Sequence, residues 1–400
     1  SILFIANFIL LVSCRDELPL ETFEYENYLV VEATLTNVQK QQEIKLSRTT
    51  HLDTSFANIE TNAEVYVMVN ETDRYDFEQT ATDGSYFSTE AFSAQTGFEY
   101  QLFINTEEGR SYSSTIIRPN PPATINNFYA ERTVNADSIN GIQVLMDIDG
   151  GENRFFRFEY EETYKVVSPF PSPFEYEIID FVDDPENGIE YDVRLTPNPR
   201  QETVCYSTIN SSGINLGTSG SLNENSLKRQ PIIFIQEDSP KIRERYSILG
   251  TVYTQGQASY TFYKNLRDLS TNDDLLSQKQ PGFIAGNISS LNSQDEDVLG
   301  FFDVSLQSER RIYFNYVDFD LLPPPYFFSC ELDYYDYLDN TTRDLSPNFR
   351  QLLYIFLLTG DYKIYSRSAP PADNSFALIR DYCSDCTLFS SNVKPEFWED

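Results

Sequence analysis

Residues 63–69 read AEVYVMV, and residues 97–104 read GFEYQLFI. In both stretches apolar and polar side chains alternate, which is typical of a β-strand with one buried face. Similar strand candidates lie before and after them, separated by turn sequences at intervals of about 8 to 12 residues. They are residues 28–35, 43–46, 83–87 and 111–117. This spacing predicts a β-sandwich domain over residues 28–118.

Three prolines then interrupt the chain and predict a domain boundary. They are Pro119, Pro121 and Pro122. The strand pattern resumes at about Thr124, so we expect a larger β-rich second domain with disulfides over residues 124–400. One stretch differs: residues 257–269 read QASYTFYKNLRDL and place apolar side chains at helical spacing. The sequence therefore predicts an all-β protein with one amphipathic helix packed against the second sheet.

The first residues are typical of an exported protein. Residues 2–12 read ILFIANFILLV, which suits the apolar region of a signal peptide and is too short for a spanning helix of about 20 residues. No basic segment precedes it, so we expect residues 1–13 to be a truncated signal peptide. The following Leu11-Val12-Ser13-Cys14 resembles the bacterial lipobox, which implies cleavage before Cys14 and acylation of its thiol. An ordinary signal peptide with an incidental cysteine is the alternative.

An acidic segment follows Cys14 and predicts where the protein is displayed. Arg15-Asp16-Glu17 is continued by further glutamates within residues 14–27. An acidic run behind the lipidated cysteine resembles the export signal of surface lipoproteins in the Bacteroidota-type outer membrane. A simple solvated tether is the other interpretation. We expect an outer-membrane protein that is lipid-anchored and exposed on the cell surface.

Composition excludes several functions. The 400 residues contain 29 basic and 62 acidic side chains, a net charge of −33, which argues against nucleic-acid binding. The only histidine is His51, so motifs that need two histidines are excluded. There is no Gly-x-Ser-x-Gly elbow, phosphate loop or dinucleotide fingerprint. We therefore expect no catalytic residues, no metal site and no cofactor.

Four cysteines remain after Cys14, an even number that predicts disulfides in an oxidising compartment. They are Cys205, Cys330, Cys383 and Cys386. Three pairings are possible, and the sequence does not choose among them. Cys383 and Cys386 also form a Cys-x-x-Cys pair, for which thiol redox chemistry and half of a zinc site are alternatives. The chain has no second such pair to complete a zinc site.

Two segments combine prolines with aromatic residues: residues 170–174 read FPSPF, and residues 323–328 read PPPYFF. Rigid aromatic rings are favoured where a partner or a sugar is bound. We expect Tyr326, Phe327 and Phe328 to contact a partner or ligand. The alternative is that these rings cover the second core.

Several short motifs, taken in order, make a family resemblance. After the lipobox come Val31–Thr36 (VEATLT), an Asp-Gly-x-Tyr and Tyr-x-Leu module over residues 83–102, Gly286-Asn287-Ile288, and the closing residues 383–398 with KPEFW. The module itself resembles transthyretin-like and immunoglobulin-like domains. Together the motifs resemble the Bacteroidota outer-membrane lipoproteins grouped as domain of unknown function family 4249. That family is often encoded beside a TonB-dependent transporter and carries no assigned reaction.

The resemblance implies a non-enzymatic accessory or binding subunit of an outer-membrane TonB-dependent β-barrel transporter, active in nutrient capture or gating. A stand-alone surface adhesin or glycan-binding module is the alternative. A secreted glycosidase or esterase is a third hypothesis. The sequence does not identify the ligand.

Overall fold

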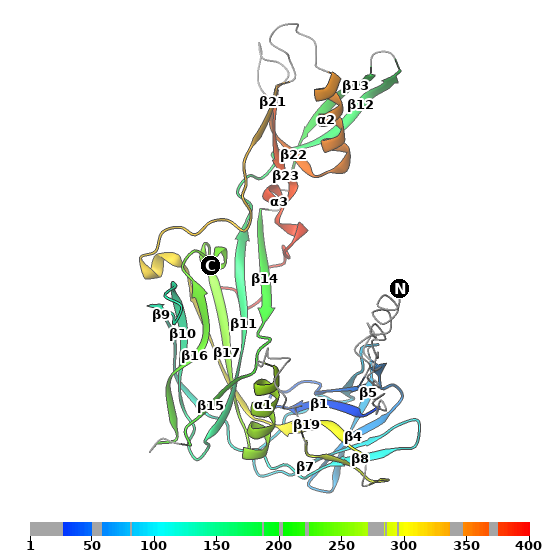
Figure 1. The fold of residues 1–400 in the computed structure, drawn as a ribbon, viewed down its shortest axis with the longest axis vertical. Helices are drawn as coiled ribbons and strands as arrows, with labels where there is room; N and C mark the ends of the chain where they lie inside the picture. Colours follow the sequence, from blue (N-terminus) through cyan, green and yellow to red (C-terminus); the bar gives the residue numbers. More distant parts are fainter. Residues whose placement is uncertain are drawn as a thin grey trace, which may run out of the picture.

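A computed structural model describes residues 27–49, 58–80, 82–185, 188–199, 203–220, 224–270, 284, 286–293, 296–336, 347–367 and 375–400. Strands contain 51% of the residues and helices contain 12%, which confirms the all-β class. The elements form three bodies in an elongated molecule, each with its own apolar core (Figure 1). We call them the first, second and third body in the order in which the chain enters them; the first lies beside the lower half of the second, and the third lies at the top of Figure 1.

The first body is a ten-stranded sheet wrapped around one core. Its strands are β1 (Leu29–Leu35), β2 (Glu43–Arg48), β3 (Asn58–Ile59), β4 (Glu64–Val69), β5 (Asp73–Gln79), β6 (Ser85–Ser88), β7 (Tyr100–Asn105), β8 (Ser111–Ser114), β18 (Ile288–Ser290) and β19 (Val298–Val304). They follow the order β18-β8-β7-β4-β5-β6-β2-β1-β19, with β3 beside β2. Alternation buries every second residue of β1, as the sequence pattern predicts.

The two ends of this sheet meet and are joined by side-chain hydrogen bonds. The Asn287 amide accepts a bond from the Phe302 backbone N–H at 2.8 Å and donates one to the Phe302 carbonyl at 2.9 Å. The strands approach so closely that a Cβ on Gly286 would lie 1.7 Å from the Gly300 carbonyl oxygen. The sandwich expected over residues 28–118 is therefore completed by β18 and β19, which return from far along the chain.

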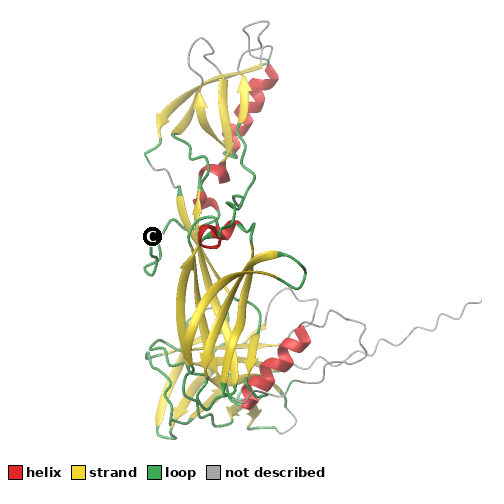
Figure 2. Ribbon diagram, turned by 90° about the vertical axis from the view of Figure 1, so that its left-hand side faces the viewer, coloured by secondary structure: helices red, strands yellow, loops and turns green. Residues whose placement is uncertain are grey.

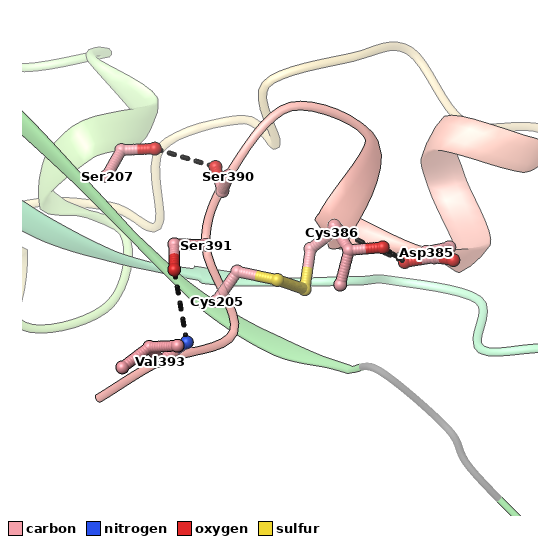
Figure 3. The surroundings of a disulfide bond; sticks show 8 residues. Cys205, Ser207, Asp385, Cys386, Ser390, Ser391 and Val393 are labelled. Atoms are coloured by element: carbon pink, nitrogen blue, oxygen red, sulfur yellow. Dashed lines mark hydrogen bonds between the residues drawn. A yellow bond between two sulfur atoms is a disulfide. The ribbon is translucent and has the colours of Figure 1, made fainter.

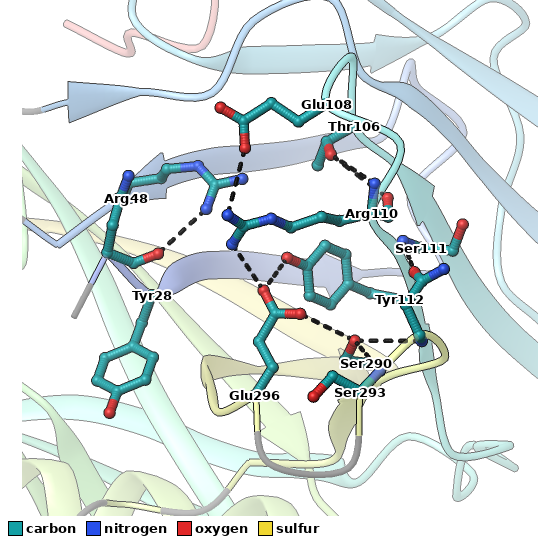
Figure 4. A network of polar contacts seen from close by, with 12 residues as sticks. Tyr28, Arg48, Thr106, Glu108, Arg110, Ser111, Tyr112, Ser290, Ser293 and Glu296 are labelled. Atoms are coloured by element: carbon teal, nitrogen blue, oxygen red, sulfur yellow. Dashed lines mark hydrogen bonds and ion pairs between the residues drawn. The ribbon is translucent and has the colours of Figure 1, made fainter.

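A carboxylate fixes this returning segment to the first body (Figure 4). Glu296 accepts hydrogen bonds from Arg110 at 3.0 Å, from the Tyr112 hydroxyl at 2.5 Å and from Ser290 at 3.0 Å. Burial acts to raise the pKa of Glu296, but the three hydrogen bonds outweigh it and hold the pKa below its usual value. Burial, together with the bond to Glu296, raises the pKa of Tyr112 to about 12.

The second body begins after the prolines at 119–122, where the sequence predicts a boundary. It contains a three-stranded sheet of order β16-β10-β9 and a second sheet of order β14-β11-β17-β20, with β15 beside β11. The strands are β9 (Thr124–Val134), β10 (Asn140–Asp149), β11 (Phe155–Val167), β14 (Val204–Asn210), β15 (Asn215–Thr218), β16 (Ser226–Gln236), β17 (Tyr246–Thr254) and β20 (Gln307–Phe314). Short 3-10 turns, η1 (Pro240–Ile242) and η2 (Tyr316–Phe319), follow β16 and β20.

The third body has a core of its own, so residues 124–400 do not form one domain. Helix α2 (Pro347–Thr359) packs against the hairpin β12 (Phe174–Asp184)–β13 (Gly188–Pro197) and the sheet β21 (Asp333–Asp336)–β23 (Ser375–Arg380)–β22 (Tyr362–Arg367). The hairpin is inserted between β11 and β14 of the second body, which explains why two cores share this sequence range. The sequence predicted one long helix only, so α2 is an addition.

Two disulfides hold the junction between the second and third bodies. Cys205 of β14 bonds Cys386 in η3 (Cys386–Leu388), and Cys330 bonds Cys383 in the short α3 (Asp381–Ser384). Figure 3 shows the first bond beside the Ser207–Ser390 hydroxyl contact of 2.6 Å. Each cysteine of the Cys-x-x-Cys pair thus has a different partner, which is a structural arrangement rather than a redox pair or half of a zinc site.

Helix α1 (Gln257–Ser270) confirms the predicted helix, but its position differs from the expectation. It lies across the junction of the first and second bodies (Figure 2) and contacts both β19 and β11. None of the helices in the described ranges is long and apolar enough to span a membrane.

Candidate functional site

The floor of the candidate site is the outer face of the first body's sheet. Because alternate residues of β1 enter the core, Val30, Glu32 and Thr34 face outward. Leu299 and Phe301 extend this surface on the parallel neighbour β19. The result is a partly apolar strip along two paired strands.

Helix α1 forms the wall above this strip. Phe262 packs on Phe301 with ring centroids 5.3 Å apart, and Tyr260 packs on Phe155 of the second body at 4.9 Å. Between helix and sheet lies a groove of about 760 Å³, within the roughly 300–1,000 Å³ of small-molecule sites. We call it the α1 groove; its lining includes Leu266, Tyr263 and Ile284.

A buried carboxylate fixes the wall to the floor. Asp303, at the end of β19, is 2% exposed and accepts hydrogen bonds from the Ser259 hydroxyl at 2.8 Å and the Ser305 hydroxyl at 2.7 Å. Ser259 belongs to the first turn of α1 and Ser305 follows β19. Because a buried carboxylate needs these donors, the start of α1 cannot leave β19 without a large penalty. The groove is therefore preformed.

The polar end of the groove is Arg157 of β11. Its guanidinium lies between two aromatic rings, 4.4 Å from the Tyr253 centroid and 4.9 Å from the Tyr263 centroid, and pairs with Glu159. The Arg157 Nε donor is buried and has no hydrogen-bond partner. Burial raises the pKa of Tyr263, and the Arg157 charge offsets part of that rise.

This arrangement is suited to binding a small molecule. The groove offers apolar and aromatic surface together with charged side chains. They are Glu32, Lys40, Glu43, Lys45 and Arg157. Its described lining contains no serine, cysteine or histidine but does contain the two glutamates. Within the described ranges, no three His, Cys, Asp or Glu side chains are grouped to hold a metal ion.

The predicted site residues have mixed outcomes. Cys14, Arg15, Asp16, Glu17 and His51 lie outside the described residues. The four other cysteines form the two disulfides given above. None of the four disulfide cysteines lines the α1 groove, which sequence reasoning did not find.

The predicted contact residues divide between surface and core. Tyr326 and Phe328 are 37% and 40% exposed, and the Arg243 guanidinium covers the Tyr326 ring at 3.7 Å. Phe327 packs on the second core and stacks on Tyr164 at 5.3 Å. Tyr326 and Phe328 therefore lie at the surface, while Phe327 covers the core, as the alternative interpretation held. Contact of these rings with a partner or ligand stays a prediction.

The third body, at the far end of the molecule, carries a surface with several exposed apolar side chains (Figure 1). Helix α2 buries Leu353 and Leu357 but leaves Leu352, Ile355 and Leu358 exposed by 39%, 44% and 64%. On the adjoining hairpin, Phe181 is 46% exposed and stacks on Tyr354 of α2 at 5.0 Å. We call Leu352, Ile355, Leu358 and Phe181 the α2 face. Grouped exposed apolar side chains are typical of interaction surfaces.

A family model described as "Domain of unknown function (DUF4249)" matches residues 15–311, which include the first body, α1, most of the second body and the β12–β13 hairpin. No curated protein matches the chain.

Proposed function

The chain belongs to the family of domain of unknown function DUF4249, and we propose that it is a non-enzymatic binding subunit of an outer-membrane TonB-dependent transporter. In this proposal the protein is a surface lipoprotein that captures a small nutrient in the α1 groove and docks on the transporter through the α2 face. The observation that carries the docking step is the exposed row of apolar side chains on α2.

The anchor expected at Cys14 supports this arrangement. The chain from Cys14 to Asn27, with 12 residues between them, reaches about 43 Å at ~3.3 Å for each of its 13 steps. The first body would therefore stay near the bilayer, while the third body extends along the long axis of the molecule. Confinement to one membrane raises the effective concentration of any partner embedded in it, so a modest apolar contact suffices for association.

Affinity purification from solubilised outer membrane tests the docking. Ile355→Glu with Leu358→Glu places two charges on the α2 face, and we expect it to reduce the recovered transporter at least tenfold. Charged side chains in an apolar interface lose hydration without gaining a partner. Leu322→Glu, at a position 87% exposed on the second body, is the matched control and should leave recovery unchanged. Metabolic fatty-acid labelling that is retained by wild type and lost in Cys14→Ala tests the anchor in the same cells.

The α1 groove alone would also suit a stand-alone glycan-binding module, since ligand capture needs no transporter. The same purification separates the two functions. If wild type is recovered without a transporter even after crosslinking, the subunit proposal is wrong and the stand-alone binder replaces it.

A further inference from the structure

A second cavity lies on the second body, where the C-terminal segment covers it. It measures about 400 Å³, and its lining includes Lys165, Arg243, Glu244, Arg245, Trp398 and Asp400. We call it the Trp398 cavity. Three cations line it in a chain where acidic residues outnumber basic ones by 62 to 29.

Strand register places two of these cations directly against each other. Tyr164 of β11 pairs with Tyr246 of β17, so the adjacent Lys165 stands opposite Arg245, and the Lys165 N–H donates to the Arg245 carbonyl at 3.0 Å. Like charges at directly opposed positions of an antiparallel pair repel each other. Neither side chain has an ion-pair partner within 4.0 Å among the described residues.

The walls of the cavity carry buried donors without acceptors. Trp398 is 5% exposed, with its ring 4.9 Å from that of Tyr206 and 6.3 Å from that of Tyr313. Its Nε1–H is buried and has no hydrogen-bond partner, and the same holds for the Nε donors of Arg243 and Arg245. Eight buried side-chain atoms in the described part of the chain lack a partner, and three of them belong to this one cavity. These three donors have almost no accessible surface, so they lie within the packed walls and a ligand in the cavity does not reach them.

Two carboxylates also line the cavity but do not satisfy these donors. Asp400 is 69% exposed at its side chain and pairs with Lys394 at 2.6 Å, outside the cavity lining. The hydrogen bond from Lys394 lowers the pKa of Asp400, and the charges of Lys165 and Arg245 lower it further. Glu244 is the other carboxylate. The lining therefore carries three cations and two carboxylates, and one of the carboxylates is already paired with Lys394.

We propose that the Trp398 cavity binds a small organic molecule through an oxyanion, a carboxylate or sulfate group, that pairs with Lys165 and Arg245. Such an anion would remove the repulsion between the two cations. The cavity volume leaves room for the body of the ligand beside its charged group.

The chain contains one tryptophan, so indole fluorescence reports on this cavity alone. The purified full chain is titrated at constant ionic strength with glucuronate, glucose 6-sulfate, sodium sulfate and neutral glucose. We expect a saturable change with both organic anions, weaker binding of inorganic sulfate and no change with glucose. Lys165→Gln and Arg245→Gln should each weaken the organic anions at least tenfold, whereas Arg310→Gln, an exposed arginine elsewhere on the same sheet, should not.

A stability measurement separates a binding site from a structural cluster. Without ligand, Lys165→Gln removes a repulsion, so its thermal midpoint should equal or exceed that of wild type, and glucuronate should raise the midpoint of wild type only. A lowered midpoint in Lys165→Gln, equal responses in wild type and both variants, or binding confined to inorganic sulfate would each overturn the proposal. None of these outcomes depends on the transporter.

Discussion

Replacing Glu296 with Gln should loosen the returning segment that completes the first body. The carboxylate accepts three hydrogen bonds, two of them from Arg110 and the fully buried Tyr112. Hydrogen bonds to a charged group contribute about 1.5–3 kcal/mol, while the half-exposed Arg110 adds less because water screens it. Glutamine keeps one oxygen for Tyr112 but loses the charge. We expect Glu296→Gln to cost about 2 kcal/mol.

The effect should depend on pH in a defined direction. The folded-state pKa of Glu296 is lowered, so its contribution is fully present above the unfolded value of about 4.3 and is lost as pH falls through the folded value. The difference between wild type and Glu296→Gln should shrink accordingly in acid. Tyr112 behaves oppositely, because its pKa is raised in the folded state. Its contribution to the stability of the first body is fully present below about pH 10 and is lost as pH rises through about 12.

Hydrogen exchange is the suitable assay, because a chain with three cores does not unfold in one step. Amide protection in β8 and β18 reports on the first body alone. Glu108→Gln is the matched control, since Glu108 also pairs with Arg110, at 3.5 Å, but its side chain is 63% exposed. If Glu296→Gln lowers protection no more than Glu108→Gln does, the Glu296 network contributes nothing and the reasoning is refuted.

Two other predictions concern the junctions and the sheet ends. Replacing Cys330 and Cys383 with Ser opens a loop with a sequence separation of 53, which should cost about 4 kcal/mol and speed proteolysis of the third body only; equal proteolysis of all three bodies would contradict this. Gly300→Ala should strongly lower the thermal midpoint, because φ is +115° and the new Cβ would lie 1.9 Å from the Val31 carbonyl oxygen, whereas Gly213→Ala meets nothing within 4 Å and is the control.

The alternation of apolar and polar residues predicted most strands of the first body. Two elements that it did not predict, β5 and α2, have clear physical causes. Strand β4 was predicted because Val65, Val67 and Val69 all enter the core. Strand β5, DRYDFEQ, was missed because its alternation rests on two aromatic residues only, Tyr75 and Phe77, and of these only Phe77 is fully buried. Helix α2 was missed for the opposite reason: its LLYIFLL run is apolar on every side and has no helical period.

Pairing between distant segments is not visible in a single sequence. The parallel β1–β19 pair joins Leu29 to Val298, and neither strand carries a local signal for the other. Likewise the even cysteine count predicted disulfides, but the choice of Cys205–Cys386 and Cys330–Cys383 depends on how the third body is inserted. The α1 groove was missed because Glu32 and Thr34 look like the ordinary solvent side of an edge strand.

In the Trp398 cavity, a disulfide bond helps to position a residue that lines the proposed binding site. Trp398 reaches the second body because the Cys205–Cys386 bond holds the preceding turn against β14, and the Tyr206–Ser391 backbone pair continues that attachment. The cations on the sheet come from β11 and from the residues before β17, far away in sequence. The disulfide therefore helps to hold Trp398 in the lining of the cavity beside Lys165 and Arg245. A cavity built in this way is complete only in an oxidising compartment, which agrees with the surface location proposed from the N-terminal sequence.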